Sequence, residues 1–313
     1  MSEPEVLVSV DAGVGRIILN RPRAINAVNL SMMQRISQAL AEFAEDDRID
    51  SVELTGAGER GLCAGADVRE LRARALDGGD VSEFFAVEYQ LNLAIAAFAK
   101  PYRALMTGIT MGGGLGLSAH GSQRVVDASS SLAMPETQIA LFPDVFMTYL
   151  FARMPGEVGT HLALTGASVN ATDAIRLGLA DECAGPAPDP DPALTGAWIA
   201  QCYHGDDPAE IVGRLSEHRD PDARAAAVEL GRRSPLSIAV SLEALRRSAR
   251  LATIADQYDQ ELTVAVRLAT SAEFAEGVRA QLVDRDRSPK WSYRDVGEVS
   301  RAEVLSYFEP LSA

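Results

Sequence analysis

The stretch GITMGGGLGLSAHG, residues 108–121, carries three consecutive glycines where a strand-like pattern changes into a helix-like one. A glycine inside a helix or strand costs about 1 kcal/mol relative to alanine. The run therefore predicts one of two things: very close packing of a helix against a strand, or a helix start whose bare N–H groups approach a ligand oxygen. A developing oxyanion is the species that most needs such donors. The G-x-G-x-x-G spacing of dinucleotide-binding proteins is absent from this stretch.

The segments around the run alternate between strands and helices. Apolar and β-branched runs predict strands in 6–20, 51–56, 102–109 and 123–134, and helical spacing predicts helices in 31–46, 81–100 and 113–121. Ser31 is the expected N-cap of the first helix. This rhythm indicates an α/β fold of repeated strand–strand–helix units.

From about residue 145 the chain reads as helix after helix, and CAGPAPDPDPALTG, residues 183–196, predicts an exposed linker. We expect an α/β core in residues 1–190 and a helical C-terminal region in residues 191–313.

Composition excludes several classes of function. The 313 residues carry a net charge of −15, which argues against nucleic-acid or anionic-membrane partners. No apolar run approaches the ~18 residues of a membrane span, and the N-terminus shows no signal-peptide pattern. A cytoplasmic protein is expected.

Cysteine and histidine give no sign of a metal site or a disulfide framework. Cys63, Cys183 and Cys202 are scattered, as is usual in a reducing compartment. The four histidines have no metal-ligand spacing, so structural or surface roles are expected for them: His120, His161, His204 and His218.

A second loop could cooperate with the glycine run. GLCAGADVREL, residues 61–71, has small residues at Ala64, Gly65 and Ala66, and Asp67 could cap the helix that follows. By itself the loop is ordinary. Two small-residue loops that each open a helix could supply two converging N–H donors.

Two carboxylates stand out in MPETQIALFPDV, residues 134–145. Glu136 and Asp144 are flanked by apolar side chains, and Pro143 breaks any single helix between them. A carboxylate in apolar surroundings is costly without a partner or a task. Helix capping is the alternative for both.

Together, NRPRAINAVN, CAGADVREL, the glycine run and MPETQIALFPDV resemble the crotonase, or enoyl-CoA hydratase/isomerase, superfamily. The resemblance runs from about residue 5 to residue 309 and is weakest between 184 and 230. KPYRALMTGITMGGGLGLS, AMPETQIALFPDV and EFAEGVRAQLVDRDRSPKW are most similar to its 3-hydroxyisobutyryl-CoA hydrolase subgroup. It implies a spiral of strand–strand–helix units followed by a helical region.

The resemblance also implies a site. It assigns the oxyanion hole to the backbone N–H groups of Ala66 and Gly113, and the catalytic pair to Glu136 and Asp144. It places the coenzyme A loop at Arg23, Ala24 and Ile25 and further substrate contacts at Ala64, Asp67, Gly112 and Phe146. Lys290 would contact a phosphate or serve the structure.

One comparison favours hydrolysis over hydration. Hydratases of the superfamily use a second glutamate just after the glycine run, where this chain has Gly116, and have a glycine in place of Asp144. The chain also departs from the hydrolase subgroup. Phe146 and Met147 stand where small residues are expected, and Val87 replaces an acid.

The resemblance implies hydrolysis of a short acyl-CoA thioester, 3-hydroxyisobutyryl-CoA or a related 3-hydroxyacyl-CoA as in valine catabolism. Glu136 would act as general base or as nucleophile, and no metal or redox cofactor is required, because coenzyme A is part of the substrate. A hydratase or isomerase and a non-catalytic acyl-CoA-binding protein remain alternatives. A homo-oligomer, trimer or hexamer, would be usual for the superfamily.

Overall fold

A computed structural model describes residues 3–311. The chain forms two compact units, which are described separately. Unit 1 comprises Met1–Asp67, Ala86–Ala133 and Ser168–Asp191, and unit 2 comprises Val68–Phe85, Met134–Ala167 and Pro192–Ala313. The expected division of the chain near residue 190 stays a prediction.

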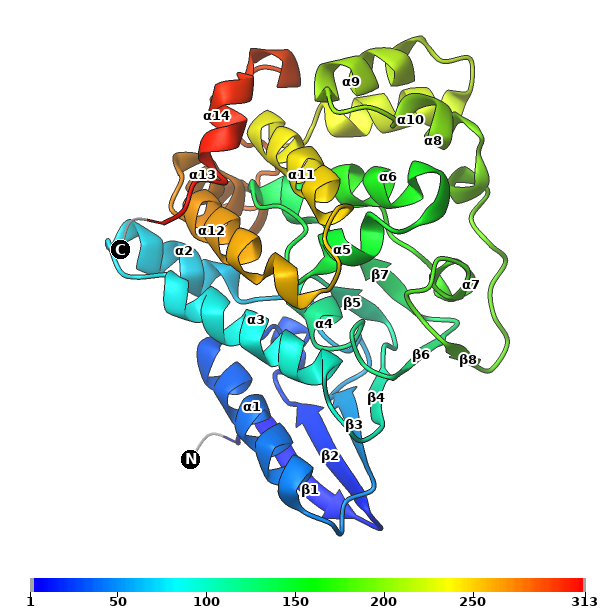
Figure 1. The fold of residues 1–313 in the computed structure, drawn as a ribbon, viewed down its shortest axis with the longest axis vertical. Helices are drawn as coiled ribbons and strands as arrows, with labels where there is room; N and C mark the ends of the chain where they lie inside the picture. Colours follow the sequence, from blue (N-terminus) through cyan, green and yellow to red (C-terminus); the bar gives the residue numbers. More distant parts are fainter. Residues whose placement is uncertain (1–2, 312–313) are drawn as a thin grey trace. The chain divides into compact units, whose positions relative to one another are not determined.

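Unit 1 is built on two sheets (Figure 1). Its strands are β1 (Val6–Asp11), β2 (Val14–Leu19), β3 (Ser51–Gly56), β4 (Tyr102–Leu105), β5 (Ile109–Met111), β6 (Gln123–Asp127), β7 (Ser131–Ala133) and β8 (Glu182–Ala184). Six of them form one sheet in the order β1-β2-β3-β4-β6-β8, which is parallel except for the β1–β2 hairpin.

The second sheet gives unit 1 its spiral character. β4 pairs with β6 in the large sheet, and the strands that follow each of them, β5 and β7, pair in a parallel two-stranded sheet. A parallel bridge between Cys63 and Thr110 extends this second sheet toward the preceding turn of chain. The predicted strand 102–109 is therefore two strands, and Gly108, with φ 58°, lies at the corner between them.

Unit 1 also contains helical elements. They are η1 (Pro22–Ala24), α1 (Leu30–Glu45), α3 (Ser82–Ala96) from Ala86 onward, α4 (Gly113–Gly116) and α7 (Ala171–Arg176). α1 packs on β1 and β2 and buries Met33, Ile36 and Leu40 at helical spacing.

Two sequence predictions about these helices need correction. The N-cap of α1 is Asn29, whose Oδ1 accepts the Met32 N–H at 2.9 Å, because the helix begins at Leu30, before Ser31. The Ser31 hydroxyl donates to the same oxygen. The helix predicted over 113–121 ends at Gly116 and continues as turns.

Unit 2 is mainly helical. Its elements are α2 (Val68–Leu76), the first turn of α3, η2 (Glu136–Ile139), α5 (Met147–Phe151), η3 (Pro155–Glu157), α6 (Val158–Thr165), η4 (Pro192–Thr195), α8 (Trp198–Cys202), α9 (Pro208–Glu217), α10 (Pro221–Leu230), α11 (Pro235–Ser248), η5 (Ala255–Gln257), α12 (Tyr258–Ala269), α13 (Ala272–Val278), the π-helical turn η6 (Arg279–Val283), η7 (Val296–Glu298) and α14 (Arg301–Ser306).

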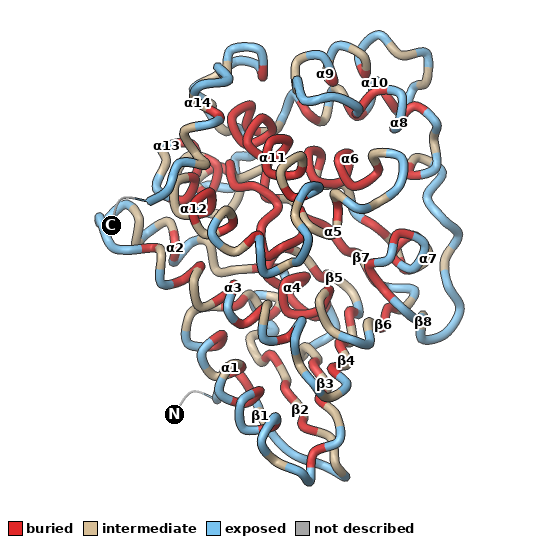
Figure 2. The backbone as a smooth tube through the Cα atoms, in the orientation of Figure 1, coloured by how far each residue is buried: buried red, intermediate tan, exposed pale blue. Residues whose placement is uncertain are grey.

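α11 is the central helix of unit 2. It packs against α5, α6 and α14, and Figure 2 shows it buried along most of its length. The predicted linker is exposed and irregular through residues 185–191, while Leu194 in η4 is buried. Within residues 3–311, no helix is both long and apolar enough to cross a bilayer.

Candidate functional site

The two loops singled out in the sequence meet in unit 1. A parallel bridge joins Val28 to Ala66: Val28 N–H donates to Gly65 O at 2.9 Å, and Val28 O accepts from Asp67 N–H at 2.7 Å. In such a bridge the N–H of Ala66 itself points to the other side of its strand. Gly113 is the first residue of α4, so its N–H has no acceptor within the helix.

These two N–H groups belong to closely packed backbone. A Cβ atom added to Gly113 would lie 3.4 Å from Ala66 N, and one added to Gly65 would lie 3.7 Å from Gly113 N. The structure thus places the expected donors, Ala66 and Gly113, side by side in one unit. Two adjacent backbone donors of this kind can bind one oxyanion.

The glycine run serves close packing of the backbone. A Cβ on Gly114 would lie 2.6 Å from the carbonyl oxygen of Cys63, so this glycine is required for close packing. Gly112 has φ 50°, a conformation that favours glycine, and its N–H donates to Ala133 O at 3.2 Å. The close-packing interpretation therefore holds for Gly114, and the approach of a ligand oxygen to the run stays a prediction.

The expected coenzyme A loop adjoins these donors in unit 1. Arg23 and Ala24 are exposed in η1, and Ile25 ends this turn with φ 49°. Ile25 O accepts the Ala64 N–H at 2.9 Å, which ties the loop to the segment that carries Ala66. Asp67 pairs with an arginine, Arg21, at 3.0 Å.

A buried carboxyl group that the sequence analysis did not single out lies beside Gly113. Glu88 in α3 is 2% exposed, and its Oε1 lies 2.5 Å from where a Cβ on Gly113 would be. A side chain at Gly113 would displace it. A carboxyl group at this point can accept a hydrogen bond from a hydroxyl group of a ligand held by the neighbouring N–H groups.

Cys63, next to the same loop, is not a nucleophile. Burial raises the pKa of its thiol to about 12, and the negative charge of Glu88 acts in the same direction. A protonated, fully buried thiol is inert. Cys63 is a packing residue.

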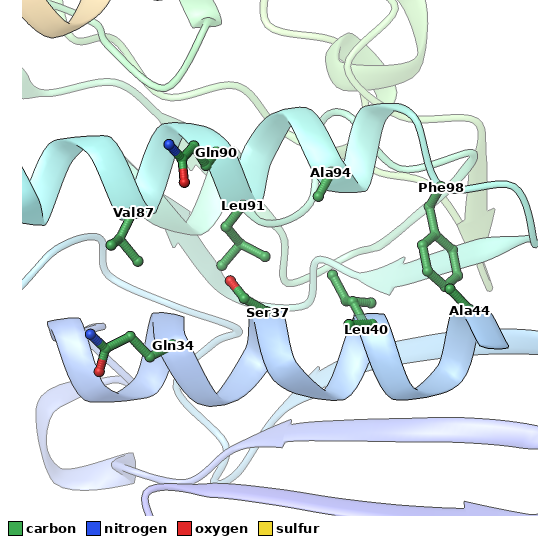
Figure 3. A pocket seen from close by; sticks show the side chains of 10 residues that line it. Gln34, Ser37, Leu40, Ala44, Val87, Gln90, Leu91, Ala94 and Phe98 are labelled. Atoms are coloured by element: carbon green, nitrogen blue, oxygen red, sulfur yellow. The ribbon is translucent and has the colours of Figure 1, made fainter. Parts of the chain in front are cut away.

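Unit 1 also has a groove between α1 and α3, of about 520 Å³ (Figure 3). Leu40, Leu91 and Phe98 line it together with Gln34 and Gln90. None of its lining side chains is titratable, so the groove offers no acid or base that could activate the hydroxyl group of Ser37, which also lines it.

The predicted carboxylates lie in one segment of unit 2. Glu136 opens η2 and is 7% exposed. The turn that follows is closed by Ala140, with φ 56°, and by the Leu141 N–H, which donates to Glu136 O at 3.0 Å. η2 packs against α13, where a Cβ on Gly277 would lie 2.6 Å from Ile139 Cα.

Asp144 is also 7% exposed and precedes a tight turn into α5. Its carbonyl oxygen accepts the Met147 N–H at 2.9 Å. α5 begins at Met147, within the region that the sequence predicted to be helical. Phe146 and Met147 are both fully buried within unit 2. Changes at either residue therefore affect packing directly.

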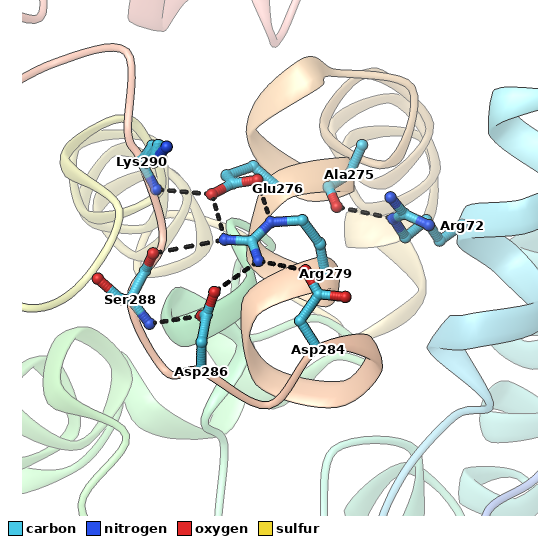
Figure 4. Close-up of polar contacts among 8 residues, drawn as sticks. All are labelled: Arg72, Ala275, Glu276, Arg279, Asp284, Asp286, Ser288 and Lys290. Atoms are coloured by element: carbon cyan, nitrogen blue, oxygen red, sulfur yellow. Dashed lines mark hydrogen bonds and ion pairs between the residues drawn. The ribbon is translucent and has the colours of Figure 1, made fainter.

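Lys290 lies in unit 2, next to a cluster of ion pairs (Figure 4). Arg279 contacts Glu276, Asp284 and Asp286 at 2.6–2.7 Å. These hydrogen bonds raise the pKa of Arg279 and lower the pKa values of Glu276 and Asp286. The Lys290 N–H donates to Glu276 at 2.7 Å, so the cluster holds the backbone from which the exposed Lys290 extends.

His161 has a structural environment. Its Nδ1 lies 2.9 Å from the Tyr203 hydroxyl and its ring stacks edge-on against Trp198. Burial lowers its pKa to about 4, so it is neutral at physiological pH. Across residues 3–311, no three His, Cys, Asp or Glu side chains are grouped as a metal ion would require.

Comparisons with known proteins agree on the family. The family model described as enoyl-CoA hydratase/isomerase matches residues 14–187 and 184–308. Mitochondrial proteins named 3-hydroxyisobutyryl-CoA hydrolase are 34% identical in Gallus gallus and 32% identical in Homo sapiens. Both alignments cover 99% of this chain, with 90% and 89% of the two relatives.

Two solved structures match almost the whole chain. A carnitinyl-CoA dehydratase from Mycobacterium thermoresistibile is 41% identical with a TM-score of 0.93, over 98% of this chain and 97% of that one. An enoyl-CoA hydratase from Rhodobacter sphaeroides is 38% identical with the same TM-score, over 98% of both chains. The fold class is thus a crotonase-like α/β spiral with a helical region. The chain belongs to the enoyl-CoA hydratase/isomerase family, and it is a crotonase-family enzyme.

Proposed function

We propose that this protein hydrolyses the thioester bond of a short 3-hydroxyacyl-CoA, with 3-hydroxyisobutyryl-CoA as the first candidate. The observation that carries the proposal is the pair of adjacent backbone donors in unit 1, Ala66 N–H and Gly113 N–H. The thioester oxygen would accept from both, and the negative charge that develops on it would be stabilised there. Removing one such donor typically raises the barrier by about 3 kcal/mol.

Glu136 supplies the reactive carboxylate. As general base it takes a proton from water, which adds to the carbonyl carbon. As nucleophile it adds to that carbon itself and forms an anhydride that water then cleaves. In both routes the C–S bond breaks, coenzyme A leaves as thiolate and takes up a proton, and a free acid forms. Asp144 orients the water or the substrate hydroxyl. The reaction requires no metal or redox cofactor.

Substrate contacts follow from the same proposal. Arg23, Ala24 and Ile25 would hold coenzyme A, and Lys290 a phosphate. Ala64, Asp67, Gly112 and Phe146 would line the substrate. Glu88 would accept a hydrogen bond from the 3-hydroxyl group, so a preference for hydroxylated acyl groups is expected.

Hydration is the second candidate, because the two similar solved structures carry the names of a dehydratase and a hydratase. Against it stands Gly116, which has no side chain to act as the second acid of a hydratase pair. The relatives named as hydrolases support the first candidate.

A panel of acyl-CoA esters tests the proposal. Free thiol released by the purified protein is measured for acetyl-CoA, butyryl-CoA, 3-hydroxybutyryl-CoA and 3-hydroxyisobutyryl-CoA. The two hydroxylated esters should have the highest kcat/KM. No thiol release from any of them would overturn the proposal.

A further inference from the structure

The backbone around Asp144 adopts an unfavourable conformation within unit 2. Val145 has φ 48° and Phe146 has φ 61°, and neither is a glycine. A positive φ is uncommon for any residue with a side chain, and for a β-branched residue such as valine it is an outlier. Two such residues in succession persist only where the surrounding structure holds them.

A buried carboxyl group on α12 holds this turn. Glu261 is 0% exposed, and its Oε1 accepts the Phe146 N–H at 2.6 Å. Its Oε2 accepts from Gln257 Nε2 at 2.6 Å, and the same Nε2 donates to Thr148 Oγ1 at 2.6 Å. Ser248 on α11 completes the network through Thr148 at 3.3 Å. Elements from α5, α11 and α12 thus converge on the turn that carries Asp144.

Glu261 is also electrostatically coupled to Asp144. The pKa of Glu261 is raised to about 8, mainly by burial and in addition by the negative charge of Asp144. The hydrogen bonds from Phe146 and Gln257 act in the opposite direction. The other partners of the network, Thr148 and Ser248, are neutral. Near pH 7 Glu261 is therefore mostly a neutral acceptor, and above pH 8 it becomes an anion beside Asp144.

We propose that Glu261 is the positioning residue of Asp144: its buried carboxyl group fixes the strained turn through Phe146 N–H and so sets the position of the Asp144 carboxylate. This inference rests on the proposed function, since the position of Asp144 matters to the reaction only if Asp144 takes part. Glu261 acts through Asp144 and does not contact the substrate.

Two substitutions of Glu261 separate its role as a hydrogen-bond acceptor from the effect of its negative charge. Glu261→Gln keeps a neutral oxygen for Phe146 N–H, while its NH2 group faces Gln257, whose amide must turn to present its own oxygen. Glu261→Met has a similar length and offers only a weak thioether acceptor. Asp259→Asn, on an exposed position of the same helix, is the charge control. Circular dichroism and Tm establish that each variant is folded.

With the best thioester of the panel, Glu261→Met should lower kcat about tenfold or more at pH 7, with KM changed by less than about threefold. Glu261→Gln should keep kcat within about threefold of wild type at pH 7, and it should lack the fall in kcat that we expect for wild type above about pH 8. Full activity in Glu261→Met, or an alkaline fall in Glu261→Gln equal to that of wild type, would overturn the inference. If Glu261→Met does not fold, the pH profile of Glu261→Gln decides.

A double-mutant cycle tests whether Glu261 acts through Asp144. Adding Glu261→Met to Asp144→Asn should lower kcat by less than about threefold further, because the group to be positioned is already disabled. The same tenfold loss in both backgrounds would show an effect independent of Asp144 and overturn the inference.

If the protein releases no thiol at all, the proposed function is refuted. The coupling between Glu261 and Asp144 is then tested by thermal stability instead of by kcat. At pH 9, Glu261→Gln should raise Tm more in the wild-type background than in Asp144→Asn, since removing either charge relieves the same repulsion. Equal shifts in Tm would contradict the coupling.

Discussion

At the residue scale, the proposed chemistry depends most on Glu136. Glu136→Gln keeps the shape of the side chain but removes its ability to act as base or nucleophile, so thioester cleavage should fall more than a hundredfold, a barrier increase of about 3 kcal/mol. Affinity for coenzyme A, measured by calorimetry, should stay within about threefold. Glu217→Gln, at an exposed position of α9, is the control. Retention of about a tenth of wild-type turnover would refute the role of Glu136.

Gly113 is the residue at which access and packing can be separated. Gly113→Val places a side chain 2.5 Å from Glu88 Oε1 and 3.4 Å from Ala66 N, so it should abolish turnover even in molecules that remain folded. Gly213→Val on α9, where an added Cβ meets nothing within 4 Å, is the matched control. We expect the loss of kcat in Gly113→Val to exceed what its change in Tm explains. A near-normal rate would mean that the run serves packing alone.

At the scale of elements, the buried Glu261 on α12 should make the free energy of unfolding depend on pH. The pKa of Glu261 is about 8 in the folded protein against 4.5 in the unfolded chain. Below pH 4.5 the carboxyl group is protonated in both states and does not lower the free energy of unfolding. As the pH rises from 4.5 to about 8, the free energy of unfolding falls by at most about 5 kcal/mol, because only the unfolded chain ionises readily. Glu261→Gln should remove this loss. Chemical unfolding at pH 5, 7 and 9 measures this loss. If the difference in free energy of unfolding between Glu261→Gln and wild type is the same at all three pH values, Glu261 is not a buried ionisable group.

Phe146 and Met147, at the start of α5, are expected to influence which acyl group the protein accepts. Phe146 and Met147 are fully buried, so replacing both by glycine would cost several kcal/mol and risk unfolding. Phe146→Leu and Met147→Ala, tested singly, are milder. If these side chains limit the acyl pocket, the ratio of kcat/KM for 3-hydroxyisobutyryl-CoA over acetyl-CoA should rise by about threefold or more. A constant ratio would assign both residues to packing.

At the scale of the whole molecule, periodicity predicted most element types and the α/β class, because it reports directly on buried faces, while the spiral arrangement was predicted from the family resemblance. Boundaries were less predictable: α1 begins at Leu30, since Asn29 and Ser31 are both good caps and only tertiary position selects one. The two interleaved compact units depend on long-range packing that no local pattern reports.

Among the buried carboxyl groups that the sequence analysis did not single out, Glu88 and Glu261 had a signal in the sequence. Glu88 shares a helical face with Phe84 and Leu91, and Glu261 shares one with Val264 and Leu268. A carboxylate at an apolar position of a helical pattern indicates a buried, functional or paired group. The cytoplasmic location and the oligomeric state stay predictions, and size-exclusion chromatography with light scattering measures the latter.

The most direct test of the central claim follows two reactions in one preparation of the protein. Thiol release from 3-hydroxyisobutyryl-CoA and loss of enoyl absorbance from crotonyl-CoA are measured side by side, with Glu136→Gln as the blank for both. We predict rapid thiol release and very slow or no hydration, because Gly116 supplies no second carboxylate. Rapid hydration of crotonyl-CoA without thiol release would contradict the account and establish a hydratase.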